Sequence, residues 1–553
     1  MTVISSKSYT ITAEATRIFN SLVNDPRLDV PEIVKCAARH VTIQARHEVP
    51  FLPTPLKMTE SSTALWAYLS AWSLAIMNAR YGLDEETAVV DAEQATLYLF
   101  SFALVRFNGV PIQDKRFALR ATQYDTGKYN EPYRALATNI YPTRDGKFCL
   151  LHGGLNATRI LRMVGMPDSQ PELTREEAIA AHTKNISENF DSHWLEITAN
   201  ERYRQSSTVC NTFEEFLVSE HGKAIKDDPI YIVKQVDASL PPVGWPEATK
   251  GSGRPLEGIR IIDFSRIIAG PAITKICALL GATVIRISSN PQQPDVAVLM
   301  FDGNLGKRDT SLNMKSEEGK DAFEALLLGA DVIMDGFRPG SLDRLGFTRD
   351  YMRLLARKRG KGLILARENC YGWKGPLQHR SGWQQISDCL TGVAWAQGKF
   401  LGLDEPVLPL LPNADYQAGI CGAIAILDAI YKRATLGGSY TVDLSLSQFN
   451  VFFQKQGLLP VVEQERLLKR YEGELSFRHY DDALSLSQKM AKLFAKHEPK
   501  LLDPEKVYAK ADSNWGEEGE IMEYVKPPAS FSSIKLFPDV GTTQAGTYSP
   551  QWP

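Results

Sequence analysis

The chain has 553 residues, 44% hydrophobic and 23% charged, which is the composition of a globular protein with about two to four domains. Its formal net charge of −3 and its lack of a long apolar run give no support to nucleic-acid or membrane partners. The seven cysteines lie far apart, which argues against a disulfide framework and a structural zinc site. Residues 1–20 resemble neither a signal nor a transit peptide, so we expect a cytoplasmic protein.

The first half of the chain predicts helices mixed with short strands. A helix over residues 61–82 precedes a strand over 87–91 and a second helix over 93–102. A hairpin is expected over residues 139–151, with its turn at Asp145-Gly146. Further helices are expected over 157–164, 176–190 and 191–200. A stretch rich in proline and glycine, residues 236–255, predicts a linker.

After the linker, predicted strands alternate with helices. The strands are expected over residues 259–264, 283–287, 331–334, 363–366 and 440–444, and the helices over 271–280, 316–328, 351–358, 383–395 and 415–433. This alternation predicts an α/β fold whose parallel sheet is covered by helices on both faces, with ligands beyond the carboxyl ends of the strands. No Gly-x-Gly-x-x-Gly, phosphate-loop or metal-ligand spacing is present, so we expect neither a nucleotide cofactor nor a metal.

One stretch, residues 411–422, carries a single carboxylate at the head of a long apolar run. Counting from Asp415 at helical spacing gives only small residues: Ala418, Gly419, Gly422 and Ala423. We expect the helix dipole and free N–H groups to hold Asp415 ionised, as a nucleophile attacking an acyl group requires. The small neighbours would leave room for the substrate. The alternative is an Asp that merely caps a tightly packed helix.

Two segments of the chain share a helix–strand–helix pattern. Aligning Asp91 with Asp443 sets Thr63 opposite Asp415, so an internal repeat would lack the acid in its first copy. Chance similarity between two amphipathic units is the competing explanation.

From residue 255 to about residue 450, the chain resembles the class III CoA-transferase family, which includes formyl-CoA transferase, carnitine CoA-transferase and α-methylacyl-CoA racemase. The resemblance rests on the order and spacing of several segments. They are residues 255–266, 269–271, 280–286, 306–308, 312–319, 330–332, 337–346, 371–376 and the Asp415 stretch.

The N-terminal part resembles the later half of a family member, so the chain is similar to a long, rearranged form associated with fungi. The resemblance implies a Rossmann-like large domain and a smaller α+β domain. We expect a partial late-half repeat at 1–110, a small-domain-like segment at 111–235, a linker at 236–254, the large domain at 255–460, and a tail packing back on it at 461–553. Whether two chains interlock as a homodimer, as family members do, is left open.

The resemblance also implies the chemistry. Asp415 matches the catalytic acid, which would form a mixed anhydride with the acyl group of an acyl-CoA and then an aspartyl-CoA thioester, from which a carboxylic acid acceptor takes the CoA. Arg266, Leu312, Lys315 and Arg344 match CoA-binding positions of the family. For Lys315 and Arg344, the alternative is an ordinary solvated charge.

Two rival functions remain. In the racemase branch, a His precedes the catalytic Asp as its acid–base partner, but here Trp383 occupies that position, with His379 four residues earlier. A diverged, non-catalytic protein is the second rival, because the sequence departs from family positions such as Asp335-Gly336-Phe337. His152 is a residue that the family's small-domain loops could bring to the acyl group, although a lone His is commonly structural.

Overall fold

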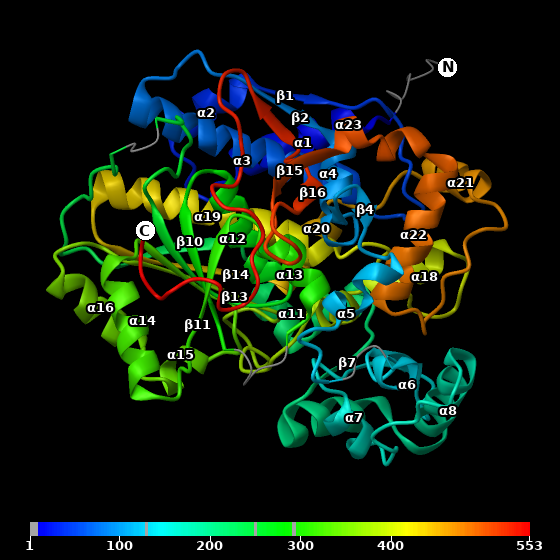
Figure 1. The fold of residues 1–553 in the computed structure, drawn as a ribbon. Helices are drawn as coiled ribbons and strands as arrows, with labels where there is room; N and C mark the ends of the chain where they lie inside the picture. The colour runs from blue at the N-terminus through cyan, green and yellow to red at the C-terminus, as the bar shows by residue number, and fades with distance from the viewer. Residues whose placement is uncertain (1–8, 128–130, 248–250, 290–294) are drawn as a thin grey trace, which may run out of the picture.

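The computed structural model describes residues 9–127, 131–247, 251–289 and 295–553. Its centre is a seven-stranded sheet with the order β11-β10-β9-β12-β13-β14-β8 (Figure 1). The strands are β9 (Arg260–Phe264), β10 (Thr283–Ser288), β11 (Lys307–Ser311), β12 (Val332–Asp335), β13 (Ile364–Asn369), β14 (Ser439–Ser445) and β8 (Ile232–Asp237).

All neighbours in this sheet are parallel except β8, which pairs antiparallel with β14 at the edge. Numbered along the chain from β9, the six parallel strands follow the order 3-2-1-4-5-6 of the doubly wound fold. In this order, β10 and β11 are added on one side of β9, and β12 to β14 on the other. The connections therefore leave β9 and β12 in opposite directions, which opens a crevice at the carboxyl ends of these two strands.

Helices cover both faces of the sheet, because alternate strand residues enter two different cores. Ile261, Val332 and Ile364 belong to the core shared with α12 (Ala269–Leu279) and α19 (Asn413–Leu436). The residues that follow each of them, Ile262, Ile333 and Leu365, pack with α14 (Glu317–Gly329) and α16 (Arg349–Lys358). The predicted α/β class is therefore confirmed.

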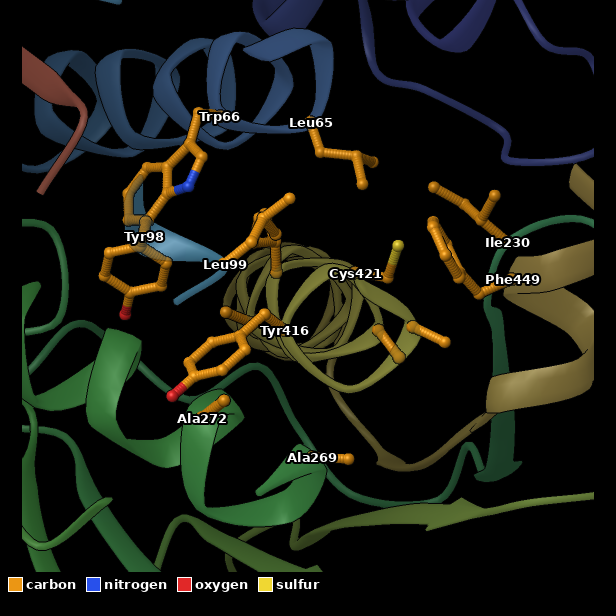
Figure 2. Packing of buried hydrophobic residues seen from close by; sticks show 14 of the residues in the cluster. Leu65, Trp66, Tyr98, Leu99, Ile230, Ala269, Ala272, Tyr416, Cys421 and Phe449 are labelled. Carbon is orange, nitrogen blue, oxygen red and sulfur yellow. The ribbon is translucent and has the colours of Figure 1, made fainter. Parts of the chain in front are cut away.

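Helix α19 is the most enclosed element. Its residues from Asn413 to Ile430 are all buried, between α12 on one side and α3 (Met58–Tyr81) on another (Figure 2). A Cβ placed on Gly419 would lie 2.7 Å from the Cβ of Ala272 in α12, and one on Gly422 would lie 2.5 Å from Ile273. Helix α12 thus fills the small-residue face of α19, and the expectation that this face leaves room for substrate is wrong.

A second, smaller unit precedes the main sheet. Strand β1 (Val41–Gln44) runs parallel to β2 (Ala88–Asp91), with α3 between them and α4 (Ala92–Tyr98) after them. The elements β13, α19, β14 and α20 (Leu446–Lys455) follow the same order, with α17 (Gln384–Leu390) and α18 (Val393–Phe400) inserted between β13 and α19. The corresponding Thr63 is buried and donates its hydroxyl hydrogen to the carbonyl of Thr59.

Residues 131–209 form a separate small α+β body that projects from the main one (Figure 1). Strands β5 (Asn139–Pro142), β6 (Phe148–His152) and β7 (Ser206–Val209) form its antiparallel sheet. The predicted hairpin turn is present, with Gly146 at a φ of 73°. The helices around it are α6 (Pro132–Ala135), α7 (Thr158–Met163), α8 (Arg175–Asn189), α9 (Ser192–Ile197) and a π-helix, Thr198–Tyr203.

Residues 461–553 contact both halves of the chain. Strand β17 (Ala529–Phe531) pairs with β2, and β16 (Ile521–Val525) joins β15 (Tyr508–Asp512) to β3 (Arg106–Phe107). At the chain end, the indole N–H of Trp552 donates to the carbonyl of Leu326 in α14. The expected linker shares residues 236–237 with β8, and its residues 248–250 lie outside the described part of the chain.

Further α-helices and one further short strand complete the description of the α-helices and strands. The helices are α1 (Ile11–Val23), α2 (Glu32–Ala37), α5 (Ala118–Ala121), α10 (Phe213–Val218), α11 (Glu220–Ile225), α13 (Ala297–Gly303), α15 (Ser341–Arg344), α17 (Gln384–Leu390), α18 (Val393–Phe400), α21 (Val461–Arg470), α22 (Ala483–His497) and α23 (Pro504–Val507), and one short strand is β4 (Val110–Pro111). Within the described ranges, no helix is long and apolar enough to cross a membrane.

The single helix expected over residues 383–395 is wrong, because the chain forms α17 and α18 instead. The break lies at Gly392, whose φ is 89°. A Cβ at this position would lie 2.3 Å from the backbone nitrogen of Phe213. Both the positive φ and the close backbone therefore require glycine, which interrupts the helix.

The close packing of α19 on α12 generates a stability prediction. Gly419→Ala should destabilise the protein by about 1–3 kcal/mol through overpacking against Ala272, although helix propensity alone would favour alanine by about 1 kcal/mol. Chemical denaturation measures the difference. The double variant Gly419→Ala/Ala272→Gly should recover much of the loss. A Gly419→Ala protein as stable as wild type would contradict this packing.

Candidate active site

Asp415 lies in the first turn of α19 and is 9% exposed. Burial raises the pKa of its carboxyl well above the usual value, and the nearby acids Glu368 and Asp388 raise it further. The expectation that the helix dipole holds Asp415 ionised is therefore corrected. The dipole favours a charged carboxylate by only about 0.3–2 kcal/mol, which burial beside two further acids outweighs.

A polar pocket occupies the crevice where the strand order reverses. Its walls come from the segments after three strands: residues 266–270 after β9, residues 336–339 after β12, and Glu368, Asn369 and Cys370 at the end of β13. Asp415 closes the pocket from the head of α19. The site is therefore built at the position where doubly wound sheets bind their ligands.

A second cavity, mostly apolar and of about 200 Å³, lies on the other side of Asp415. Its walls come from separate parts of the chain, which include Phe102 and His152 from the first half, Val296, Val298 and Leu299 of the main body, the segment 408–412, and Asp482, Ala483 and Ser487 of the tail. The two cavities share Asp415, Trp383, Ile267 and Ile268. Asp415 therefore lies where a polar pocket meets an apolar one.

Ile267, at this junction, has a backbone φ of 78°. A β-branched residue in the left-handed region is a conformational outlier that costs about 1–3 kcal/mol. Such strain persists only where the surrounding structure enforces it, and it is concentrated at functional sites. No sequence pattern predicts this conformation at Ile267.

Trp383 and His152 form one wall of the apolar cavity. Their rings are stacked, with centroids 4.9 Å apart and planes 4° from parallel. The N–H of Gly154 donates to Nδ1 of His152 at 3.0 Å, and burial lowers the pKa of His152 to about 3. His152 is therefore a neutral imidazole at neutral pH, and it lines the cavity that holds Asp415. His379, by contrast, is exposed and contacts Glu201 at 3.2 Å.

Two carboxyls that the sequence did not single out accompany Asp415. Asp388 accepts hydrogen bonds from Asn450 at 2.9 Å and from Gln384 at 3.0 Å, and burial raises its pKa to about 7. Glu368 is 7% exposed, and within the described ranges its side-chain carboxyl has no hydrogen-bond or ion-pair partner. Burial and then Asp335 raise its pKa to about 8. The site thus gathers three buried acids, and burial raises the pKa of each of them.

Arginines surround the other side of the polar pocket. Arg266 and Arg338 line it, and Arg338 lies near Arg159, Arg204 and Arg344, whose positive charges together with burial lower its pKa. In the part of the chain that the structure describes, Arg338 has no acidic partner, and it donates to the carbonyl of Arg204 at 3.2 Å. An arginine at a pocket wall with no acidic partner among the described residues, as Arg338 is, suits a phosphate-bearing anion.

The four positions predicted to bind CoA are dispersed. Only Arg266 lines the pocket. Arg344 is exposed and donates to the carbonyl of Pro339 at 3.4 Å and to the hydroxyl of Ser341 at 3.1 Å, so it braces the pocket's rim. Leu312 is buried in the core under α14, and Lys315 is exposed on the turn before that helix. Arg338, which also lines the pocket, lies within the segment 337–346 that carries the family resemblance, and its positive charge is the feature that could have identified it.

Comparison with known proteins bears on this site. The model of CoA-transferase family III matches residues 256–481. The acetyl-coenzyme A transferase nodX of Hypoxylon pulicicidum is 33% identical over 99% of this chain and 94% of its own length. An acyl-CoA transferase of Gibberella moniliformis is 32% identical over 73% of this chain and 72% of its own.

Among solved structures, the protein Rv3272 from Mycobacterium tuberculosis is 19% identical, with a TM-score of 0.39 over 53% of this chain and 97% of that one. The sequence similarity to nodX extends over almost the whole chain, including its N-terminal half. The protein therefore belongs to CoA-transferase family III.

Proposed function

We propose that this protein is an enzyme that moves CoA from an acyl-CoA to a carboxylic acid, with Asp415 as the nucleophile. The observation that carries the proposal is the position of Asp415 between two unlike cavities. The polar pocket, with its arginines, suits the phosphates and pantetheine of CoA. The apolar cavity suits the acyl group, so the thioester carbonyl would lie at Asp415.

The proposed reaction has two halves. The ionised Asp415 carboxylate attacks the thioester carbonyl, CoA leaves as a thiolate, and a mixed anhydride forms. The thiolate then attacks the aspartyl carbonyl, which gives an aspartyl-CoA thioester and releases the donor acid. An acceptor carboxylate repeats these steps in reverse and leaves as the new acyl-CoA.

Proton sharing among the acids would govern the first step. Buried carboxyls close together titrate as a coupled group, so a protonated Glu368 or Asp388 favours ionisation of Asp415. A protonated Glu368 also resembles the neutral acids that donate hydrogen bonds to a developing oxyanion. We propose this role for Glu368.

For CoA we retain Arg266 as a direct contact and add Arg338, because both line the pocket. Leu312, Lys315 and Arg344 remain proposed contacts of the adenine and phosphate end, outside the pocket itself. No metal or nucleotide cofactor is part of the proposal. The seven cysteines are free thiols, in accord with a cytoplasmic location.

We also propose that the chain is built as late half, linker, early half and tail. The β1–α3–β2–α4 unit supports this order, with Thr63 in place of the nucleophile. A homodimer remains compatible with this arrangement.

An acyl-CoA racemase is the alternative that a specific observation favours, since His152 and Asp415 line the same cavity. A racemase needs an acid and a base on the two sides of the α-carbon. With its pKa lowered to about 3, His152 is a weak base. Its stacking on Trp383 supports a role as a wall of the cavity instead.

The nucleophile is tested by labelling. After incubation with hexanoyl-CoA, hydroxylamine should convert Asp415 to a hydroxamate that peptide mass spectrometry locates. Asp415→Asn should lose both the label and CoA transfer while keeping its melting temperature. The control Asp388→Asn keeps Asp415 and should still be labelled. A label on Asp388 or Glu368 in wild type would contradict the assignment, as would deuterium at the α-carbon of 2-methylacyl-CoA recovered from D₂O.

Glu368 gives a pH-dependent stability prediction. Its pKa is about 8 in the folded protein against an ordinary value of 4.5, so between these values the unfolded chain ionises and the folded one does not. Wild-type stability should therefore fall across this window as pH rises, and Glu368→Gln should escape that loss.

Melting temperatures at pH 5 and pH 8 measure the effect. The advantage of Glu368→Gln over wild type should grow by roughly 2–5 °C between the two. The exposed Glu317→Gln is the matched control and should show no such growth. An advantage that is constant with pH would mean that Glu368 is ionised in the folded protein.

A further inference from the structure

The apolar cavity beside Asp415 restricts which acids the enzyme can use, an inference that rests on the proposed function. Apolar side chains from five segments line most of it: Phe102, Leu155, Ile268, Val298, Leu299 and Leu408. His152 and Trp383 add two flat rings. A group that fills this cavity would be surrounded by carbon on most sides.

The described walls of the cavity carry no cation. Its titratable lining residues are Asp388, Asp415, Asp482 and the neutral His152, and no lysine or arginine is among its described walls. The carboxylate of Asp482 already has partners outside the cavity: it caps α22 and forms an ion pair with Arg175 at 2.9 Å. A distal carboxylate on the acyl group would thus meet acids and no cation.

Lys275 is the cation of a small adjoining cavity that shares Phe102, Ile267, Ile268 and Leu299 with this one. Its ammonium is buried and donates to Asp302 at 2.6 Å. Recruiting Lys275 to a substrate would break a buried ion pair, which is strongly unfavourable. It therefore does not offer a site for a second carboxylate.

The cavity is also larger than the smallest acyl groups require. At about 200 Å³ it could hold on the order of ten heavy atoms, since a single water needs roughly 10–15 Å³ on the same measure. An acetyl group would leave most of the apolar wall uncovered. A longer aliphatic chain or an aromatic ring would cover it.

We propose that the donor and the acceptor are both monocarboxylic acids with an uncharged, apolar chain or ring larger than acetyl. The acceptor is included for a chemical reason. In the proposed reaction CoA stays in the polar pocket while the donor acid leaves, so the acceptor carboxylate reaches the aspartyl thioester through the same apolar cavity. Both acids are therefore selected by the same walls.

Isotope exchange tests this without knowledge of the natural acceptor. Each acyl-CoA is incubated with the ¹³C-labelled form of its own free acid. Mass spectrometry then follows the label as it enters the thioester. The reaction breaks one acyl–sulfur bond and forms an identical one. Hexanoyl-CoA and benzoyl-CoA should exchange. Succinyl-CoA should exchange at least about 100-fold more slowly, because its second carboxylate would be buried without a partner.

A charge placed in the wall should invert this preference. Leu299→Arg puts a cation in the cavity and should raise succinyl exchange relative to hexanoyl exchange, whereas Leu328→Arg, on the exposed face of α14, should leave the ratio unchanged. If melting shows that Leu299→Arg does not fold, Leu155→Arg, on the loop after β6, replaces it.

The outcomes separate the two proposals. Succinyl-CoA exchanging as fast as hexanoyl-CoA, or exchange confined to acetyl-CoA, would overturn the assignment of apolar acids and leave the CoA-transferase intact. If the folded protein exchanges label with none of hexanoyl-CoA, benzoyl-CoA, succinyl-CoA and acetyl-CoA, the proposed function is overturned, and this inference with it.

Discussion

The fold and the site both depend on the burial of α19 on every side. A helix enclosed by a sheet and two other helices must be apolar over nearly its whole surface, and it needs small residues where a neighbour comes close. Gly419 and Gly422 meet this need against α12. The first turn of the same helix carries Asp415 into the interior, at the crevice of the parallel sheet.

This placement explains how an ordinary carboxyl acquires reactivity. Water is excluded from its surroundings, and two further acids keep protons near it, so its charge is weakly solvated once it forms. An unsolvated carboxylate beside a thioester carbonyl is a stronger nucleophile than one in water. The strained backbone of Ile267 and the buried carboxyl of Glu368, whose pKa is raised, indicate that the site lowers the stability of the protein.

Much of this architecture could be predicted from sequence. The alternation of strands and helices after residue 255 predicted the doubly wound sheet, and the motif around Asp415 predicted its place at a helix start. The features that could not be predicted involve residues that are far apart in the sequence but close together in the fold. Glu368 and Asp388 approach Asp415 from two separate segments, and no local sequence pattern indicates that they do. The helix dipole alone predicts an ionised Asp415, but the burial of α19 raises the pKa of this carboxyl.

The central claim is that Asp415 lies between a pocket for CoA and a cavity for the acyl group. A crystal structure of Asp415→Asn with hexanoyl-CoA tests it most directly. We expect the thioester carbonyl to lie beside residue 415 and the hexanoyl chain to contact Trp383 and Leu299. The diphosphate should lie within hydrogen-bonding distance of Arg338 or Arg204. A thioester remote from residue 415, or an acyl chain in the polar pocket, would contradict it.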